Sequence, residues 1–264
     1  MNASRTRRAD LQDAVNARIY HAASVVRHYP SDVLDKAETC ALLKYQPLFA
    51  GQDVLDVGVG AGRTAIYLAP LARNYVAIDY SPVMVEEVKS RMPDLQVQLA
   101  DMRDMSAFAP GSFDFILATN NVMDAVSHTD RQRTLQEMRR VLRPQGVLMF
   151  SAHNRCYRHA MSGPRLKLAR NPFSLLRNVL TYGRRWVNYL RLRKACRQEE
   201  SYALLTDTGH DYGCLHYYID REAQEAQLRG MGFKLLDVYS VWGVALALGD
   251  FGEASPWLMY VASL

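Results

Sequence analysis

The sequence predicts an α/β protein built on a seven-stranded, mostly parallel, doubly wound sheet whose last strand is antiparallel. From residue 53 onward, short apolar runs alternate with longer amphipathic stretches, which is typical of parallel strands joined by crossover helices. About half of the 264 residues are apolar, enough to bury one full core. Between residues 155 and 215 the alternation stops for longer than a simple loop allows. We therefore expect N-terminal helices, a core sheet and a helical lid inserted into it.

The expected elements follow this alternation along the chain. Two helices, at residues 9–28 and 32–48, come before the sheet. The expected strands are residues 54–57, 75–78, 97–99, 113–118, 147–151, 234–239 and 257–262. Crossover helices are expected at residues 64–72, 82–92 and 130–142. Right-handed crossovers would place these helices on both faces of the sheet.

Local signals mark the ends of two crossover helices. Ser81 is placed to cap the second one, with Pro82 at its first helical position. Thr129 or Asp130 could cap the third, which Pro144 would end. The helix boundaries therefore agree with the strand assignment.

Composition and spacing exclude several classes of protein. Lys and Arg outnumber Asp and Glu by 32 to 27, a modest net charge of +5. The four cysteines include no Cys-x-x-Cys pair, and the spacing of His210, Cys214 and His216 matches no compact zinc motif, so we expect no bound metal. No apolar run approaches the roughly 18 residues of a membrane-spanning helix. We expect a cytoplasmic protein with reduced thiols.

A glycine-rich turn follows the first expected strand and opens the first crossover helix. Its pattern is Asp56-x-Gly58-x-Gly60-x-Gly62, with Arg63 where a dinucleotide fingerprint would need another glycine. This spacing argues against NAD or FAD. A carboxylate such as Asp56 suits a ligand that carries a sulfonium and an ammonium group, because opposite charges attract. Taken alone, the turn could also be a tight connection without a ligand.

Polar residues recur where the next strands end. Asp79 ends the second strand, where a carboxylate can accept hydrogen bonds from two ribose hydroxyls. Asp101 ends the third, where it can accept from an adenine amino group, and Asn120 and Asn121 end the fourth. Each residue alone could cap a helix. As a series they indicate one crevice at the carboxyl edge of a parallel sheet, where such sheets bind ligands.

This series of motifs resembles the class I S-adenosylmethionine-dependent methyltransferases, a Rossmann-like family. The resemblance covers residues 50–155 well and residues 217–264 more loosely, and Gln145 stands where the family often has glycine. It implies S-adenosylmethionine as the cofactor and S-adenosylhomocysteine as its product. Tyr20 is similar to a tyrosine that closes over the cofactor in some members, although a packing role explains it equally well. The cofactor-binding residues implied are Tyr20, Asp56, Gly58, Gly60, Gly62, Asp79, Tyr80, Asp101, Met102 and Asn120.

The strand and helix pattern, together with this resemblance, divides the chain into four segments. Residues 1–49 would cover the cofactor site, residues 50–154 would form the cofactor-binding core, residues 155–215 would form the basic helical lid, and residues 216–264 would complete the core sheet.

Methyl transfer needs alignment more than acid–base chemistry, since the methyl donor is already activated by its positive sulfur. Good positioning can contribute about 7 to 11 kcal/mol. A general base is needed only for a protonated acceptor such as a hydroxyl. His153 and His210 are the catalytic candidates, and Asn121, His216 and Tyr217 are the substrate-binding candidates. For each histidine alone, a surface or core role is the plainer explanation.

The insertion is strongly basic. Twelve Lys and Arg residues and no acidic residue lie between residues 155 and 197. Arg177, Arg184 and Arg191 recur every seven residues, so they share one face of a helix whose other face is apolar. This face could be a solvated surface, or it could attract an acidic substrate, nucleic-acid phosphates or an anionic membrane.

These observations lead to a methyltransferase that acts on O or N of a small, acidic or lipid-linked molecule. An RNA methyltransferase is the alternative enzyme, although no separate RNA-binding module is visible. A cofactor-binding module without catalysis is the non-enzymatic alternative, because fold and cofactor do not specify chemistry. The chain is expected to be a monomer or a homodimer.

Overall fold

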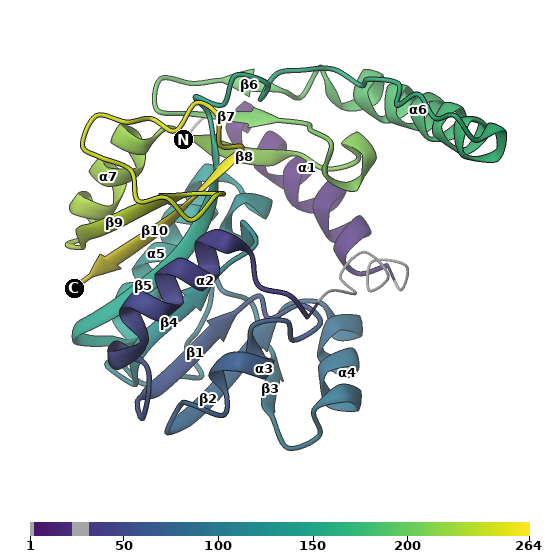
Figure 1. The fold of residues 1–264 in the computed structure, drawn as a ribbon. Coiled ribbons are helices and arrows are strands. Elements are labelled where there is room, and N and C mark those ends of the chain that lie inside the picture. The colour runs from purple at the N-terminus through teal and green to yellow at the C-terminus, as the bar shows by residue number, and fades with distance from the viewer. Residues whose placement is uncertain (1–2, 23–31) are drawn as a thin grey trace.

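The computed structural model describes residues 3–22 and 32–264 and confirms the α/β class (Figure 1). All seven expected strands are present, in the spatial order β3-β2-β1-β4-β5-β10-β9. Their bounds are β1 Asp53–Val57, β2 Asn74–Asp79, β3 Gln96–Leu99, β4 Phe113–Ala118, β5 Leu142–Asn154, β9 Lys234–Ser240 and β10 Trp257–Ser263. β1 to β5 are parallel, and β10 runs antiparallel to both β5 and β9.

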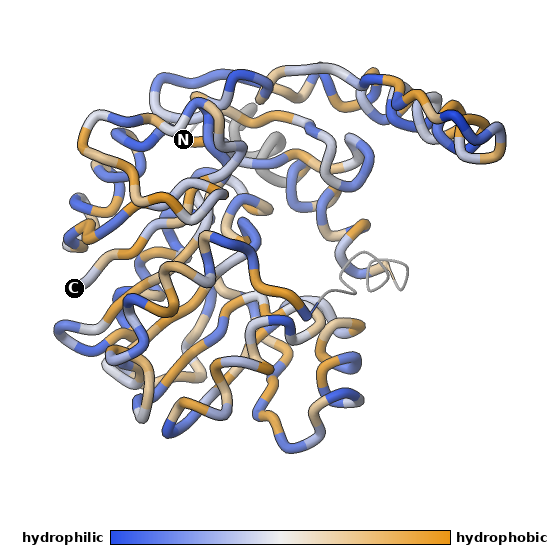
Figure 2. Tube along the Cα trace, viewed as in Figure 1, coloured by the Kyte–Doolittle hydropathy of each residue, from blue (hydrophilic) through white to orange (hydrophobic). Residues whose placement is uncertain are grey.

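Helices cover both faces of this sheet, as right-handed crossovers require. The helices of the core are α2 Lys36–Tyr45, α3 Ala65–Leu68, α4 Pro82–Arg91, α5 His128–Val141 and α7 Arg221–Gly230. Neighbouring residues of β4 belong to two different hydrophobic cores. Phe115 packs in the core with α2, α3 and α4, whereas Ile116 packs in the core with α5 and α7. Both side chains are fully buried, which stabilises the fold by about 1.5 to 3 kcal/mol each. Figure 2 shows the apolar central strands.

The N-terminal helix expected at residues 9–28 is α1, Ala3–Tyr20, and its expected end at residue 28 lies outside the described residues. The second expected helix is α2, which begins at Lys36 and is followed by a 3-10 turn, Gln46–Leu48. Among the residues that the structure describes, no helix is both long and apolar enough to cross a membrane.

Two predicted helix caps differ from the structure. Ser127 caps α5 by accepting a hydrogen bond from the Asp130 amide, so neither Thr129 nor Asp130 is the cap. Ser81 does precede α4, but its hydroxyl donates to the Tyr20 carbonyl at 2.8 Å instead of accepting from the helix. The hydrogen bond from the Ser81 hydroxyl to α1 therefore replaces the expected capping bond to an amide of α4.

The insertion contains strands as well as a helix. Its elements are α6 Pro172–Leu192, β6 Arg197–Gln198, β7 Tyr202–Leu205 and the 3-10 turn η4 Gly209–Tyr212, and β8 His216–Ile219 follows it. β6, β7 and β8 form an antiparallel meander, and β8 joins the end of β5 in parallel. Within the described residues the sheet thus has ten strands, not the expected seven. The added strands have two to four residues, too short for a clear periodicity.

Candidate active site

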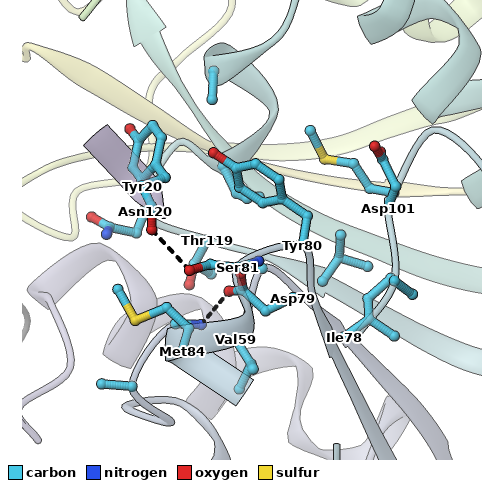
Figure 3. Close-up of a pocket in the computed structure, with 18 of the residues that line it drawn as sticks. Tyr20, Val59, Ile78, Asp79, Tyr80, Ser81, Met84, Asp101, Thr119 and Asn120 are labelled. Carbon is cyan, nitrogen blue, oxygen red and sulfur yellow. Dashed lines mark hydrogen bonds between the residues drawn. The ribbon is translucent and has the colours of Figure 1, made fainter. Parts of the chain in front are cut away.

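A cavity of about 710 Å³ opens at the carboxyl ends of β1 to β4, as the strand-end series predicts (Figure 3). α1 covers it: Asp13, Asn16 and Tyr20 belong to its lining, whereas no described residue from 155 to 215 does. The described residues of the insertion therefore do not line this cavity, and its role as a lid stays a prediction. The implied cofactor residues that line it are Tyr20, Gly58, Gly60, Asp79, Tyr80, Asp101, Met102 and Asn120.

Asp79 organises the glycine-rich turn. Its Oδ2 accepts from the Gly60 amide at 2.9 Å, and its Oδ1 accepts from the Ser81 amide at 2.8 Å. Burial raises the pKa of this carboxyl above its ordinary value, although the two amides act in the opposite direction. Gly60 has a φ of +56° and no atom within 4 Å of the place where a Cβ would stand. A ligand can therefore approach the backbone closely here.

Asp56 and Gly62 do not belong to the cavity lining, in contrast to the contacts that the resemblance implies. The Asp56 side chain is almost fully buried and accepts hydrogen bonds from the hydroxyls of Thr64, at 2.5 Å, and Tyr75. Burial raises its pKa to about 6. A Cβ on Gly62 would stand 2.2 Å from the Cε of Met92. Asp56 thus anchors the start of the turn, and Gly62 allows the turn to pack closely on Met92.

Asp101 reaches the cavity edge through an ion pair that the sequence did not indicate. Its carboxylate accepts from Arg103 Nη2 at 2.6 Å, and Arg103 also bonds to Asp13 of α1. Burial raises the pKa of Asp101, but Arg103 outweighs it and the pKa lies below its ordinary value. Arg103 therefore joins the β3 end to the helix that covers the cavity.

Two buried amide side chains fasten α1 over the cavity. Gln12 donates to the Val126 carbonyl at 2.9 Å, and Asn16 donates to the Ala125 carbonyl at 2.7 Å. Asn16 also donates to the Leu215 carbonyl and accepts from its amide. No periodic or motif signal in the sequence marks these contacts, because they join segments more than 100 residues apart.

A polar cluster stands beside the cavity, formed by His153, Asp124, Asp207, His216 and Tyr218. Asp124 lies in the 3-10 turn η3, Val122–Ala125, and its Oδ2 is 2.7 Å from His153 Nδ1. Asp207 Oδ2 is 2.8 Å from His216 Nδ1, 2.7 Å from the Tyr218 hydroxyl and 3.8 Å from His153 Nε2. His153, expected to lie near the reacting groups, is thus held between two carboxylates.

Asp207 and His216 form a buried ion pair. Burial raises the pKa of Asp207, but the charge and hydrogen bond of His216 outweigh it, so the pKa lies well below its ordinary value. Burial lowers the pKa of His216, and Asp207 more than offsets this, so the pKa is well above its ordinary value. His216 is therefore an imidazolium at neutral pH and is unsuited to accept a proton.

Comparison with known proteins supports the sequence-based family assignment. Residues 54–146 match a family model described as a methyltransferase domain. A protein of Mycobacterium tuberculosis described as a probable S-adenosylmethionine-dependent methyltransferase is 34% identical over 110 residues, which are 41% of this chain and 38% of that protein. A ubiquinone biosynthesis O-methyltransferase of Albidiferax ferrireducens is 30% identical over 112 residues, 40% of this chain and 43% of the relative.

A solved structure shares the whole fold. The Burkholderia thailandensis 1,6-didemethyltoxoflavin-N1-methyltransferase, with bound substrate and S-adenosylhomocysteine, aligns with a TM-score of 0.60 at 14% identity, covering 100% of this chain and 91% of that one. Residues 54–146 of this chain form a class I S-adenosylmethionine-dependent methyltransferase domain. The solved structure confirms the predicted fold, and the family model and the curated relatives support the predicted family and cofactor. The sequence matches span less than half of each curated relative, so they do not identify the acceptor of this protein.

The residues of the cavity fit S-adenosylmethionine. Asp13 Oδ1 is buried in the cavity wall without a partner among the described residues, so it can accept from a hydroxyl or ammonium group. Asp79 keeps free lone pairs on both oxygens beside the two amides that it accepts from. Gly60 leaves its backbone accessible to a ligand in the cavity. These donors and acceptors suit a ligand with ribose hydroxyls and a positively charged end.

Three predicted site residues lie elsewhere or in other roles. His216 and Tyr217 are neighbours on β8 and so point to opposite faces; the Tyr217 hydroxyl meets His128 Nδ1 at 2.8 Å, and Tyr218 joins the polar cluster instead. His210 lies in η4, with its ring 5.1 Å from that of Tyr20, and is not part of the cluster. Asn121 does lie at the cluster, with its Nδ2 3.4 Å from His153 Nε2.

The polar cluster also has the spacing of a metal site. One ligand atom from each of His153, Asp207 and His216 lies within 4.8 Å of the others. However, Asp207 Oδ2 already accepts from both His216 and the Tyr218 hydroxyl. We therefore interpret the cluster as an ion pair beside an Asp–His pair.

Proposed function

We propose that this methyltransferase transfers a methyl group to a hydroxyl oxygen of a small molecule that is acidic or lipid-linked, with His153 as the general base. The observation that supports this proposal most is the pairing of His153 with Asp124 at the carboxyl end of β5. A hydroxyl acceptor carries a proton that must be removed, and a carboxylate behind an imidazole is suited to that task.

The Asp124 carboxylate fixes which nitrogen of His153 carries the proton. Asp124 Oδ2 accepts from the His153 backbone amide at 2.6 Å and from Nδ1, so the lone pair is on Nε2, where Asn121 Nδ2 donates at 3.4 Å and an acceptor hydroxyl would take its place. With S-adenosylmethionine bound, His153 would take the hydroxyl proton at Nε2 as the acceptor oxygen gained the methyl group and S-adenosylhomocysteine was released. Asp124 and Asp207 stabilise the resulting imidazolium. The cofactor supplies a methyl group already activated by its positive sulfur.

The path between cavity and cluster is short. Tyr20 lines the cavity, and its hydroxyl lies 3.5 Å from His216 Nε2. Asn120 lines the cavity at the end of β4, and the next residue, Asn121, contacts His153. Both asparagines adopt a positive φ, which asparagine tolerates better than most residues. An acceptor that lies between the cavity and the polar cluster would face both the methyl donor and His153.

A panel of matched acceptors tests this proposal. The purified protein with labelled S-adenosylmethionine is given catechols, isoprenoid-linked phenols and the corresponding anilines. We expect labelled O-methyl ethers from hydroxyl compounds and little product from the anilines, identified by mass spectrometry. Methylation of the anilines alone would contradict the proposal and favour an N acceptor, such as the one in the name of the Burkholderia protein.

A further inference from the structure

Helix α6 carries an apolar face that nothing in the described structure covers. Of its 21 residues only Leu192 is buried. The exposed fractions of Phe173, Leu180 and Val187 are 84%, 67% and 67%. The exposed apolar residues of this helix are Phe173, Leu176, Val179, Leu180, Val187 and Leu190. Exposing so many large apolar side chains on one element is costly in water.

These six side chains lie on one side of the helix. At 100° per residue they occupy one arc of roughly 120°. The opposite side contacts the rest of the chain: Arg185 bonds to Asp211 at 2.7 Å, and Tyr189 packs on Tyr212. Figure 1 shows α6 as an arm that extends away from the sheet, and Figure 2 shows apolar and polar residues mixed along it. The apolar arc therefore faces outward.

Positive charge borders this apolar arc. Arg177, Arg184 and Arg191 follow one edge of it at seven-residue spacing. Arg184 pairs with Asp211, whereas Arg177 and Arg191 make no ion pair with any carboxylate in the described ranges 3–22 and 32–264. Twelve cationic residues and no acidic residue lie between residues 155 and 197. An outward apolar face edged by arginines is typical of a helix that lies in a membrane interface.

We propose that α6 docks this protein onto an anionic lipid surface. The apolar arc would enter the boundary between headgroups and acyl chains, and Arg177 and Arg191 would lie at the lipid phosphates. Docking on such a surface would bury the apolar arc and, at the same time, neutralise the arginines along its edge. Docking on lipid requires neither cofactor nor acceptor, so its test is independent of the methyl-transfer proposal.

Two other partners fit this face less well. A second copy paired through the same face would bring arginines together with no acidic residue in α6 to offset them. A nucleic acid would satisfy the arginines, but its phosphates would leave the six apolar side chains in water. The lipid surface is therefore the partner that the residues favour.

Vesicle flotation tests the proposal with two variants and a matched control. We expect the wild type to bind phosphatidylcholine–phosphatidylglycerol vesicles and to bind pure phosphatidylcholine weakly. Arg177→Gln with Arg191→Gln should weaken binding roughly 25-fold, about fivefold for each arginine near anionic headgroups. Leu180→Glu with Val187→Glu should weaken it at least about tenfold, since charges replace buried apolar groups.

The control carries the same two glutamates elsewhere. Leu43→Glu with Leu248→Glu changes two exposed residues outside α6 and should bind vesicles like the wild type. Circular dichroism and S-adenosylhomocysteine affinity should match the wild type in all three variants. The proposal is overturned if the wild type binds no anionic vesicles or if all variants bind them equally. It is also overturned if the apolar arc of α6 binds transfer RNA or a second copy of the chain instead of the vesicles.

Discussion

Replacing His153 with glutamine should lower kcat toward a hydroxyl acceptor by roughly 10²- to 10⁴-fold, the usual contribution of a general base. Glutamine can occupy a similar space and still form hydrogen bonds near Asp124, but it cannot take a proton from the acceptor. S-adenosylhomocysteine affinity should not change, because His153 does not line the cofactor cavity. Steady-state kinetics together with calorimetry separate the two effects.

A surface histidine supplies the control for this prediction. His159 is exposed, and His159→Gln should keep the wild-type kcat. A variant at His153 that retained full kcat toward a hydroxyl acceptor would remove this residue from proton transfer.

Replacing Arg131 with methionine should lower the free energy of unfolding by about 3 to 5 kcal/mol, because it leaves a buried carboxylate without its cation. The Arg131 and Asp124 side chains are both fully buried, with Nη1 2.5 Å from Oδ1. Arg131 also donates to Gln224 at 2.7 Å and lies over the Tyr217 ring. For a chain of this size the melting temperature should fall by roughly 6 to 20 °C.

The neighbouring Arg133 is exposed and gives a matched comparison. Arg133→Met should change the free energy of unfolding by no more than about 0.5 kcal/mol, as is usual for surface substitutions. Denaturant titration of both variants measures the difference. If the two variants unfolded at the same denaturant concentration, the buried pair would not support Asp124, and the support we infer for His153 would be absent.

The sequence predicts the part of the site that lies on regular strands. Alternating apolar runs place Asp79, Asp101 and Asn120 at the same edge of the sheet, and all three line one cavity. His153 follows from the same reasoning, since it lies near the end of β5. These side chains lie at one edge of the sheet because parallel strands bring their carboxyl ends together whatever their distance along the chain.

The rest of the site depends on tertiary contacts that leave no periodic signal. Asp124 lies in a short 3-10 turn and Asp207 in a connection between short strands, so neither belongs to a motif. The sequence pattern does not show the short strand β8, and strand alternation there decides that Tyr218, and not the predicted Tyr217, faces His153. Asp56 does not line the cavity, because it is buried and bonded to hydroxyl groups of neighbouring residues.

Titration calorimetry with S-adenosylhomocysteine and with NAD tests the central claim most directly, because every proposed step depends on which cofactor fills the cavity. We expect S-adenosylhomocysteine to bind the wild type and NAD to give no heat. Asp79→Ala should weaken S-adenosylhomocysteine binding about 10- to 100-fold, the loss of roughly 1.5 to 3 kcal/mol from charged hydrogen bonds, whereas Asp94→Ala, at an exposed position, should not. NAD binding without S-adenosylhomocysteine binding, or full affinity in a folded Asp79→Ala variant, would contradict the account.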